Sequence, residues 1–202
     1  MSTKIKMCGL TRNVDIESAN EVRPDFIGFV FAKKSRRYIT PEKAAELARK
    51  LDEGIVPVGV FVDSDFDEIM HAVKLGAIRI AQLHGNEPEE LVKRLQENGV
   101  PVIRAFQIKS EDDVKKAETS CADHILLDSG KGSGLTFDWS VLKNAKRPYF
   151  LAGGLDPENV SHAVTALHPY AVDVSSGLEA DGVKDKNKMI RFAESVRNTD
   201  KK

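Results

Sequence analysis

Short apolar segments alternate with longer amphipathic segments eight times along this chain, and that repetition restricts the fold more than any other feature. Each apolar segment has the length and residue types of a β-strand, and each amphipathic segment has the spacing of a surface helix. The 202 residues divided by eight give about 25 residues per unit. The expected strands cover residues 4–8, 25–31, 56–62, 78–83, 100–106, 123–128, 148–152 and 170–174.

Helix-start signals follow these strands. Thr40-Pro41 and Asp156-Pro157 each put a capping side chain before a proline at the first helical position, and Ser110 opens a third capping sequence. The expected helices cover about residues 12–22, 41–51, 65–75, 87–97, 111–118, 138–142, a segment that begins at 157, and 186–196. The last five residues, 198–202, are expected to be a solvated tail.

Eight strands that are each followed by a helix predict a closed parallel (βα)8 barrel, the TIM-barrel class of α/β fold. An open doubly wound sheet is the alternative. The eight regular units favour the barrel, as does the lack of a Gly-x-Gly-x-x-Gly turn after the first strand. The chain is short for this fold, so residues 1–202 are expected to form a single barrel domain.

Composition excludes several functional classes. Hydrophobic residues make up 41% and charged residues 30%, and the formal net charge is -1, which is typical of a soluble globular protein. The chain has no overall positive charge that would favour binding to a nucleic acid. No apolar run approaches the roughly 18 residues of a membrane-spanning helix. Without an apolar leader, a cytoplasmic protein is expected. Cys8 and Cys121 lack metal-ligand spacing and are too few for a disulfide scaffold.

The C-terminal ends of barrel strands, and the loops after them, carry the reacting groups in such folds. At the end of the first strand, Cys8 shares a face with Lys6, whereas Ile5 and Met7 share the other face. If that apolar face packs on helices, the thiol points into the barrel mouth; the alternative is a buried, inert thiol. The other candidates at strand ends are Arg36, Arg37, Asp63, Gln82, His84, Gln107, Asp128, Gly153, Gly154, Asp173, Ser175, Ser176 and Gly177.

Glycine pairs follow the seventh and eighth expected strands. Gly153-Gly154 and Ser176-Gly177 allow a ligand to approach the backbone closely, and exposed N–H groups there bind anions. The loops after these two strands are the usual phosphate position in barrels. The pattern therefore favours a phosphate-bearing ligand over plain tight turns.

Three side chains at the expected mouth have chemistry that suits a substrate. Asp128 ends an apolar strand, where burial raises a carboxyl pKa as a general acid requires, although a helix- or turn-capping role is the alternative. The segment 130–134 after it is rich in glycine and suits a lid or a linker. Arg37 suits a substrate carboxylate or a solvated loop, and His84 a substrate contact or a structural hydrogen bond.

Nine short motifs then occur in order along nearly the whole chain. They are KMCGLT at 6–11, GFVF at 28–31, SRRYI at 35–39, VGVFV at 58–62, QLHG at 82–85, LLD at 126–128, GLTFDW at 134–139, GGL at 153–155 and VDVSSG at 172–177. In this order they resemble the phosphoribosylanthranilate isomerase family, barrel enzymes of tryptophan biosynthesis. Met7 and Leu135 depart mildly from the family pattern, which has an aliphatic branched residue at the first position and often Lys at the second.

The resemblance implies an Amadori rearrangement of N-(5-phosphoribosyl)anthranilate to 1-(2-carboxyphenylamino)-1-deoxyribulose 5-phosphate, without metal or cofactor. Asp128 would protonate the furanose oxygen as general acid, and Cys8 would remove the C2 proton as general base. A thiol of pKa about 8.5 suits that step, and Lys6 is expected to favour its thiolate. The implied substrate contacts are Arg37 with the anthranilate carboxylate, Asp173 with the amine, His84 with the substrate, and Gly153, Gly154, Ser176 and Gly177 with the phosphate.

The expected partner is a small-molecule phosphosugar, and a monomer or homodimer is expected. Two alternatives stay open at this point. One is the related histidine-pathway isomerisation of a larger aminoaldose, but those enzymes resemble this chain less closely because they pair two aspartates and the first strand here ends in Cys8. The other is a non-catalytic phosphosugar-binding barrel, which would not couple Cys8 to Asp128.

Overall fold

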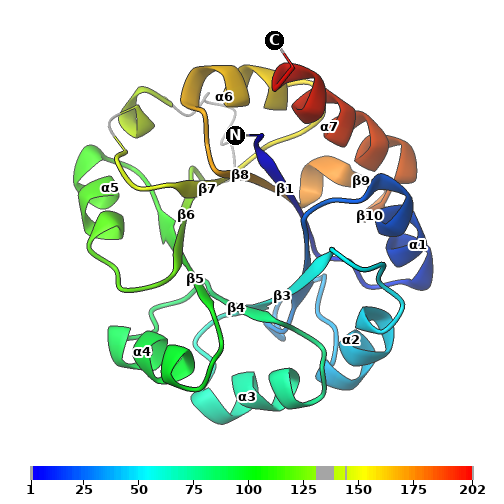
Figure 1. Ribbon diagram of the computed structural model, residues 1–202, viewed down its shortest axis with the longest axis vertical. Coiled ribbons are helices and arrows are strands. Elements are labelled where there is room, and N and C mark those ends of the chain that lie inside the picture. Colours follow the sequence, from blue (N-terminus) through cyan, green and yellow to red (C-terminus); the bar gives the residue numbers. More distant parts are fainter. Residues whose placement is uncertain (1, 131–138, 144, 202) are drawn as a thin grey trace.

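The computed structural model describes residues 2–130, 139–143 and 145–201. Eight parallel strands close into a barrel in the order β1-β2-β3-β4-β5-β6-β7-β8, with the helices outside it, as Figure 1 shows. The predicted barrel is therefore confirmed. The strands are β1 (Lys4–Cys8), β2 (Phe26–Val30), β3 (Val56–Phe61), β4 (Ile80–Leu83), β5 (Val102–Gln107), β6 (His124–Asp128), β7 (Tyr149–Ala152) and β8 (Ala171–Val174).

The helices follow the strands as the sequence predicted, with small shifts at their ends. The α-helices are α1 (Asn13–Val22), α2 (Pro41–Ala48), α3 (Phe66–Lys74), α4 (Glu89–Glu97), α5 (Glu111–Glu118), α6 (Val160–Leu167) and α7 (Lys186–Thr199). The short segment before β7 is a 3-10 helix, η1 (Trp139–Leu142). No helix in the described ranges is long and apolar enough to cross a bilayer.

Local hydrogen bonds explain why α2 begins where the sequence predicted and α6 begins later. Thr40 accepts a hydrogen bond from Lys43 N (3.2 Å), with Pro41 opening α2 as predicted. The same signal at Asp156-Pro157 was wrong as a helix start: Asp156 Oδ1 accepts from the N–H of Asn159 (2.8 Å), which closes a turn, and α6 begins only at Val160.

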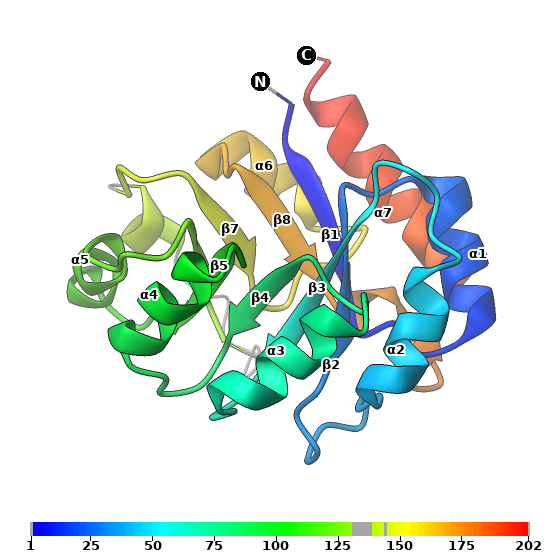
Figure 2. The ribbon, with the colours of Figure 1, turned by 60° about the horizontal axis from the view of Figure 1, so that its bottom comes forward.

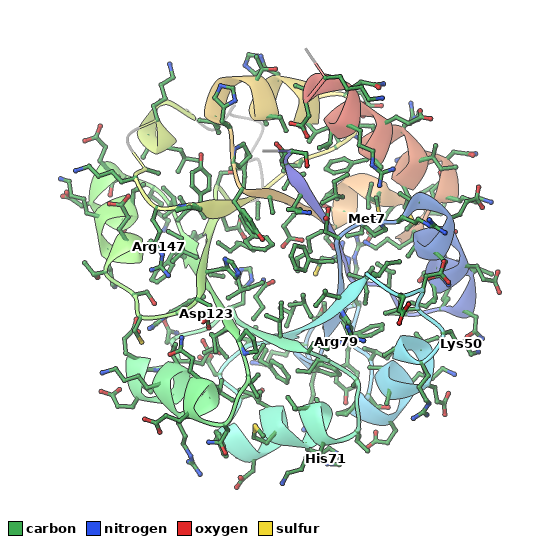
Figure 3. All side chains as sticks on the ribbon, viewed as in Figure 1. Met7, Lys50, His71, Arg79, Asp123 and Arg147 are labelled. Carbon is green, nitrogen blue, oxygen red and sulfur yellow. The ribbon has the colours of Figure 1, made fainter. Side chains whose placement is uncertain are left out.

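The inward-facing side chains change character along the barrel axis. One apolar cluster within the barrel consists of Phe26, Val58, Ile80, Ile103, Leu126, Phe150, Ala152 and Ala171. Near the C-terminal ends of the strands, Cys8 packs with Val30 and Val60 in a much smaller cluster. Ile5 and Met7 instead join the large core between strands and helices. Figure 3 shows side chains filling the ring of strands, while His71 lies on the outer ring of helices.

A small hairpin after β8 was absent from the sequence prediction. A 3-10 turn, η2 (Ser176–Leu178), leads into β9 (Glu179–Ala180), which pairs antiparallel with β10 (Val183–Lys184). Helix α7 then runs to Thr199, into the segment expected to be a tail, and Asp200 accepts a hydrogen bond from Thr3 N (2.8 Å). Figure 2 shows both termini at one end of the barrel and the C-terminal strand ends at the other.

The sequence predicts either a lid or a linker for the glycine-rich segment 130–134 after β6. Residues 131–134 of this segment lie outside the described residues, so the lid stays a prediction.

Candidate active site

A cavity of about 200 Å³ lies at the C-terminal end of the barrel interior. It is lined by Cys8, Arg37, Val60, Gln82, His84, Asp128, Gly130, Ala152, Gly153, Gly154, Leu155, Asp173, Ser175 and Ser176. Larger surface grooves of about 490 and 570 Å³ contain neither the thiol nor Asp128. The smaller cavity is therefore the candidate active site, because it alone of the three contains both reactive groups. Asp63 and Gln107 line other grooves, so the structure does not bring them to this site.

The thiol of Cys8 has room because glycine stands beside it. Cys8 is paired in register with Gly28 of β2, and a Cβ at that glycine would lie only 2.6 Å from Sγ. The chain then turns at Gly9, whose N–H donates to the Gly28 carbonyl (2.8 Å). Cys8 is 8% exposed and opens toward the cavity.

A buried ion pair lies directly below the thiol. Lys6 Nζ contacts both carboxylate oxygens of Asp173, at 2.9 and 3.0 Å, and the lysine is fully buried. Burial by itself lowers the pKa of Lys6, but Asp173 and Cys8 together raise it above its ordinary value. Asp173 therefore lines the cavity as predicted, and it also serves as the counter-ion of Lys6.

The pKa of Cys8 is raised, chiefly because the thiol is buried. Lys6 opposes that rise, as the sequence analysis expected, and so does Lys184, but Asp173 adds to it. The prediction that Lys6 favours the thiolate of Cys8 is therefore confirmed in direction. The effect of Lys6 is smaller than that of burial, and the thiol of the free protein stays protonated at neutral pH.

Asp128 ends a short chain of polar side chains. Its Oδ1 accepts a hydrogen bond from Gly130 N (2.8 Å), and its Oδ2 lies 3.4 Å from His84 Nε2. Burial alone would raise the pKa of Asp128, but His84 and the Gly130 N–H lower it below its ordinary value. The predicted raised pKa is therefore wrong for the free protein, because hydrogen bonds to the carboxylate outweigh desolvation.

His84 is in turn held by Gln82, which the sequence analysis had selected only by position. His84 Nδ1 and Gln82 Nε2 are 3.1 Å apart. Gln82 is 1% exposed, and among the described residues its Oε1 has no hydrogen-bond partner. A half-turn of the amide would exchange the two atoms and leave the nitrogen unpaired instead. Gln82 thus lines the cavity while its unpaired amide atom is buried.

Arg37 lines the cavity, and one edge of its guanidinium is already occupied. Its Nε and Nη2 donate to Glu179 at 2.5 and 3.0 Å. Lys184 Nζ reaches the same carboxylate at 3.0 Å, and Arg36 pairs with it as well. Burial would raise the pKa of Glu179, but Arg37 and Lys184 lower it to about 2. No strand-end pattern points to Glu179 or Lys184, because they lie beyond the last barrel strand, in the unpredicted hairpin.

The two glycine-rich loops meet at the cavity edge. Gly153 and Gly154 have φ of 104° and 65°, a region that favours glycine. Among the described residues, no backbone hydrogen bond outside helices and strands uses either N–H as donor. Ser176 also lines the cavity, whereas Gly177 does not. A Cβ at Gly177 would lie 2.0 Å from the Leu155 carbonyl, so this glycine lets the two loops touch.

Within the described ranges, no three His, Cys, Asp or Glu side chains gather in a way that could hold a metal ion. The absence of a metal or cofactor stays a prediction.

Comparisons with known proteins agree on one family. The family model described as N-(5'phosphoribosyl)anthranilate (PRA) isomerase matches residues 5–195. The N-(5'-phosphoribosyl)anthranilate isomerase of Caldanaerobacter subterraneus subsp. tengcongensis is 43% identical over 201 residues, covering 96% of this chain and 98% of that protein. The Streptococcus mutans protein of the same name is 43% identical over 198 residues, with 96% and 99% covered.

Solved structures give the same result. Phosphoribosyl anthranilate isomerase from Thermotoga maritima superposes with a TM-score of 0.87 at 36% identity, covering 97% of this chain and 99% of that one. A phosphoribosyl anthranilate isomerase in complex with reduced 1-(o-carboxyphenylamino)-1-deoxyribulose 5-phosphate superposes at 0.85, again at 36% identity and the same coverage. Thiamine phosphate pyrophosphorylase from Pyrococcus furiosus, at 16% identity and 0.71, shares the fold alone.

Proposed function

This chain belongs to the N-(5'-phosphoribosyl)anthranilate isomerase family, and we propose that Cys8 and Asp128 are the general base and general acid of its reaction. The protein is an aldose–ketose isomerase of tryptophan biosynthesis, which converts N-(5'-phosphoribosyl)anthranilate to 1-(o-carboxyphenylamino)-1-deoxyribulose 5-phosphate. The observation that carries the residue assignment is the shared cavity: the thiol comes from β1 and the carboxyl from β6, two strands that are not neighbours in the barrel.

The reaction needs a proton donor first and a proton acceptor second. Asp128 in its acid form donates a proton to the furanose ring oxygen, the C1–O bond breaks, and the lone pair of the anthranilate nitrogen forms the C1=N bond of an iminium. The Cys8 thiolate then removes the C2 proton, and the C–H electrons form the C1=C2 bond of an enolamine. Protonation at C1 and loss of the hydroxyl proton at C2 give the ketone. The iminium acidifies the C2 proton, so a thiolate is a strong enough base.

The protonation states of the free protein set the pH dependence. The pair holds one proton, on the thiol, because burial raises the pKa of Cys8 while hydrogen bonds lower that of Asp128. The reactive form carries the same single proton on Asp128, so it is a minor tautomer whose fraction is constant between the two pKa values. A bell-shaped profile of kcat/KM is expected, falling below the pKa of Asp128 and above that of Cys8.

His84 and Gln82 orient the acid. With Gln82 Nε2 donating to Nδ1, neutral His84 carries its proton on Nε2, the atom 3.4 Å from Asp128 Oδ2. The imidazole thereby fixes one carboxyl oxygen, and the Gly130 N–H fixes the other.

The remaining contacts follow from charge and exposure. Arg37 faces the cavity with three N–H groups beyond the two that bind Glu179, enough for the anthranilate carboxylate. Asp173 lines the same cavity as the thiol, where its carboxylate would accept from the substrate amine. The open N–H groups of Gly153 and Gly154, with Ser176, would hold the phosphate, and Gly177 keeps the two loops in contact.

Location and assembly are further proposals. A biosynthetic isomerase that acts on a phosphosugar fits a cytoplasmic location. The Thermotoga maritima isomerase is described as dimeric, and a homodimer or a monomer is equally compatible with the cavity, which lies within one chain.

The acid–base assignment is tested with single substitutions. Cys8→Ser and Asp128→Asn are each expected to lower kcat by at least about 100-fold, followed as loss of substrate anthranilate fluorescence, because general acid–base catalysis contributes about 10²–10⁴. The matched controls are Cys121→Ser, an exposed thiol, and Asp112→Asn, an exposed carboxylate. Activity of either active-site variant within tenfold of wild type would overturn the assignment. A non-catalytic barrel would show no fluorescence loss in any of the variants or in wild type.

A further inference from the structure

The hairpin β9–β10 concentrates charge at the edge of the cavity. Glu179 and Lys184 are direct cross-strand partners in it. The Glu179 side chain is 6% exposed and is contacted by three cations, Arg36, Arg37 and Lys184. One carboxylate among three cations leaves two surplus positive charges at this corner of the site.

The hairpin is fixed from both sides, so the carboxylate has little freedom to move. Lys184 Nζ donates to the Ser175 carbonyl (2.8 Å), and Ser175 Oγ donates to the Cys8 carbonyl (3.0 Å). Lys188 Nζ donates to the Glu179 carbonyl (2.6 Å). The ion cluster is therefore tied to the backbone that carries the thiol.

Arg37 is held equally tightly. Its aliphatic stem lies across Gly9, where a Cβ would come within 2.4 Å of Arg37 Cδ. Glu179 takes the Nε and Nη2 hydrogens of the guanidinium. Among the described residues none accepts a hydrogen bond from Nη1, and Arg37 lines the cavity at 19% side-chain exposure. A planar guanidinium held along one edge presents its other edge in a fixed direction.

We infer that Glu179 is a positioning residue: it fixes the plane of the Arg37 guanidinium so that the free edge receives the carboxylate of the aromatic ring of the substrate. The inference rests on the proposed function. The two surplus positive charges provide the attraction, and Glu179 provides the direction and lowers the entropy lost when substrate binds. Removing Glu179 adds net positive charge but frees Arg37 to move. We expect the loss of orientation to outweigh the gain in charge.

A second pair in the same barrel serves as a control. Arg104 and Glu89 also form an arginine–glutamate ion pair, with side chains 16% and 38% exposed, and neither lines the active-site cavity. A substitution there removes a similar interaction without affecting the bound substrate.

The test measures binding of reduced 1-(o-carboxyphenylamino)-1-deoxyribulose 5-phosphate by isothermal titration calorimetry. A second ligand is the same compound with phenyl in place of carboxyphenyl. Glu179→Gln is expected to raise the Kd of the carboxylate ligand about tenfold, as for the loss of about 1.4 kcal/mol, and to change that of the phenyl ligand by less than twofold. Glu89→Gln should change neither. In turnover, Glu179→Gln should raise KM while kcat stays within about threefold.

Two further variants keep the result interpretable. Glu179→Asp retains the charge but retracts the carboxylate. It should weaken binding of the carboxylate ligand in part and leave binding of the phenyl ligand unchanged. The same variant replaces Glu179→Gln in the test if Glu179→Gln does not fold. Adding Glu179→Gln to Arg37→Ala should cost nothing beyond Arg37→Ala itself, because both act through one contact.

An unchanged or tighter Kd for the carboxylate ligand in Glu179→Gln would overturn the inference, as would equal weakening of both ligands. Failure of wild type to bind the carboxylate ligand would instead overturn the proposed function, and the inference with it.

Discussion

Inward-facing side chains have different roles at the two ends of the barrel. At the N-terminal end, Phe150 lies against Phe26 with ring centroids 5.4 Å apart, and His124 stacks on Tyr170 at 5.3 Å. At the C-terminal end the interior holds a thiol, charged pairs and a hydrogen-bonded carboxyl. One strand shows the change: the inward-facing side chains of β6 are, in order along the strand, His124, Leu126 and Asp128. Apolar packing at the N-terminal end thus stabilises the barrel. The C-terminal end carries polar groups that do not contribute such packing.

The largest expected effect is on stability and comes from the N-terminal end. Phe150→Ala removes a fully buried ring from the apolar cluster and should lower the free energy of unfolding by about 3–5 kcal/mol, as large-to-small core changes do. Urea unfolding followed by circular dichroism measures it. Activity per folded molecule should stay within twofold, because Phe150 does not line the cavity. A fall in activity larger than the fall in folded protein would show that the two ends are not separable.

The next effect comes from Lys6, which contributes both to stability, through its ion pair with Asp173, and to the pKa of Cys8. Lys6→Met leaves the Asp173 carboxylate buried without its partner, which should cost about 3 kcal/mol of stability. Because Lys6 lowers the pKa of Cys8, its removal should raise that pKa further, measured as thiolate absorbance against pH.

Lys6→Met combined with Asp173→Asn provides the control. Removing the stranded carboxylate should recover part of the lost stability and bring the pKa of the thiol back toward the wild-type value, since Asp173 raises it. A thiol pKa that does not move in Lys6→Met would contradict an electrostatic role for this lysine.

A smaller effect is expected at the C-terminal end from one added methyl group. Gly28→Ala puts a Cβ 2.6 Å from Cys8 Sγ, so the thiol must shift, and kcat/KM should fall about 100-fold for a displacement near 1 Å. Gly59→Ala on the next strand is the matched control, because its Cβ meets Phe61 and Ile78 of the outer core instead. That variant should lose stability and keep its activity per folded molecule. Equal losses of activity in both variants would refute the close fit of glycine to thiol.

The sequence predicted the barrel because alternation of strand and helix is a local pattern repeated eight times, and it predicted the inward direction of Cys8 because side chains alternate along a strand. It predicted the strand-end residues for the same reason. It did not predict the state of those residues. The lowered pKa of Asp128 depends on Gly130 and His84, and the partner of Arg37 is Glu179, 142 positions away in the chain. Such contacts follow from closure of the barrel, which no local pattern specifies.

The central claim is that the base belongs to β1 and the acid to β6. The most direct test is the kinetic isotope effect on kcat/KM with substrate deuterated at the ribose C2, in wild type, Cys8→Ser and Asp128→Asn. Weakening the base makes C2–H cleavage slower, so the effect should rise in Cys8→Ser. Weakening the acid makes ring opening limiting, so the effect should fall toward unity in Asp128→Asn. The reverse pattern, or the same effect in all three proteins, would contradict the assignment.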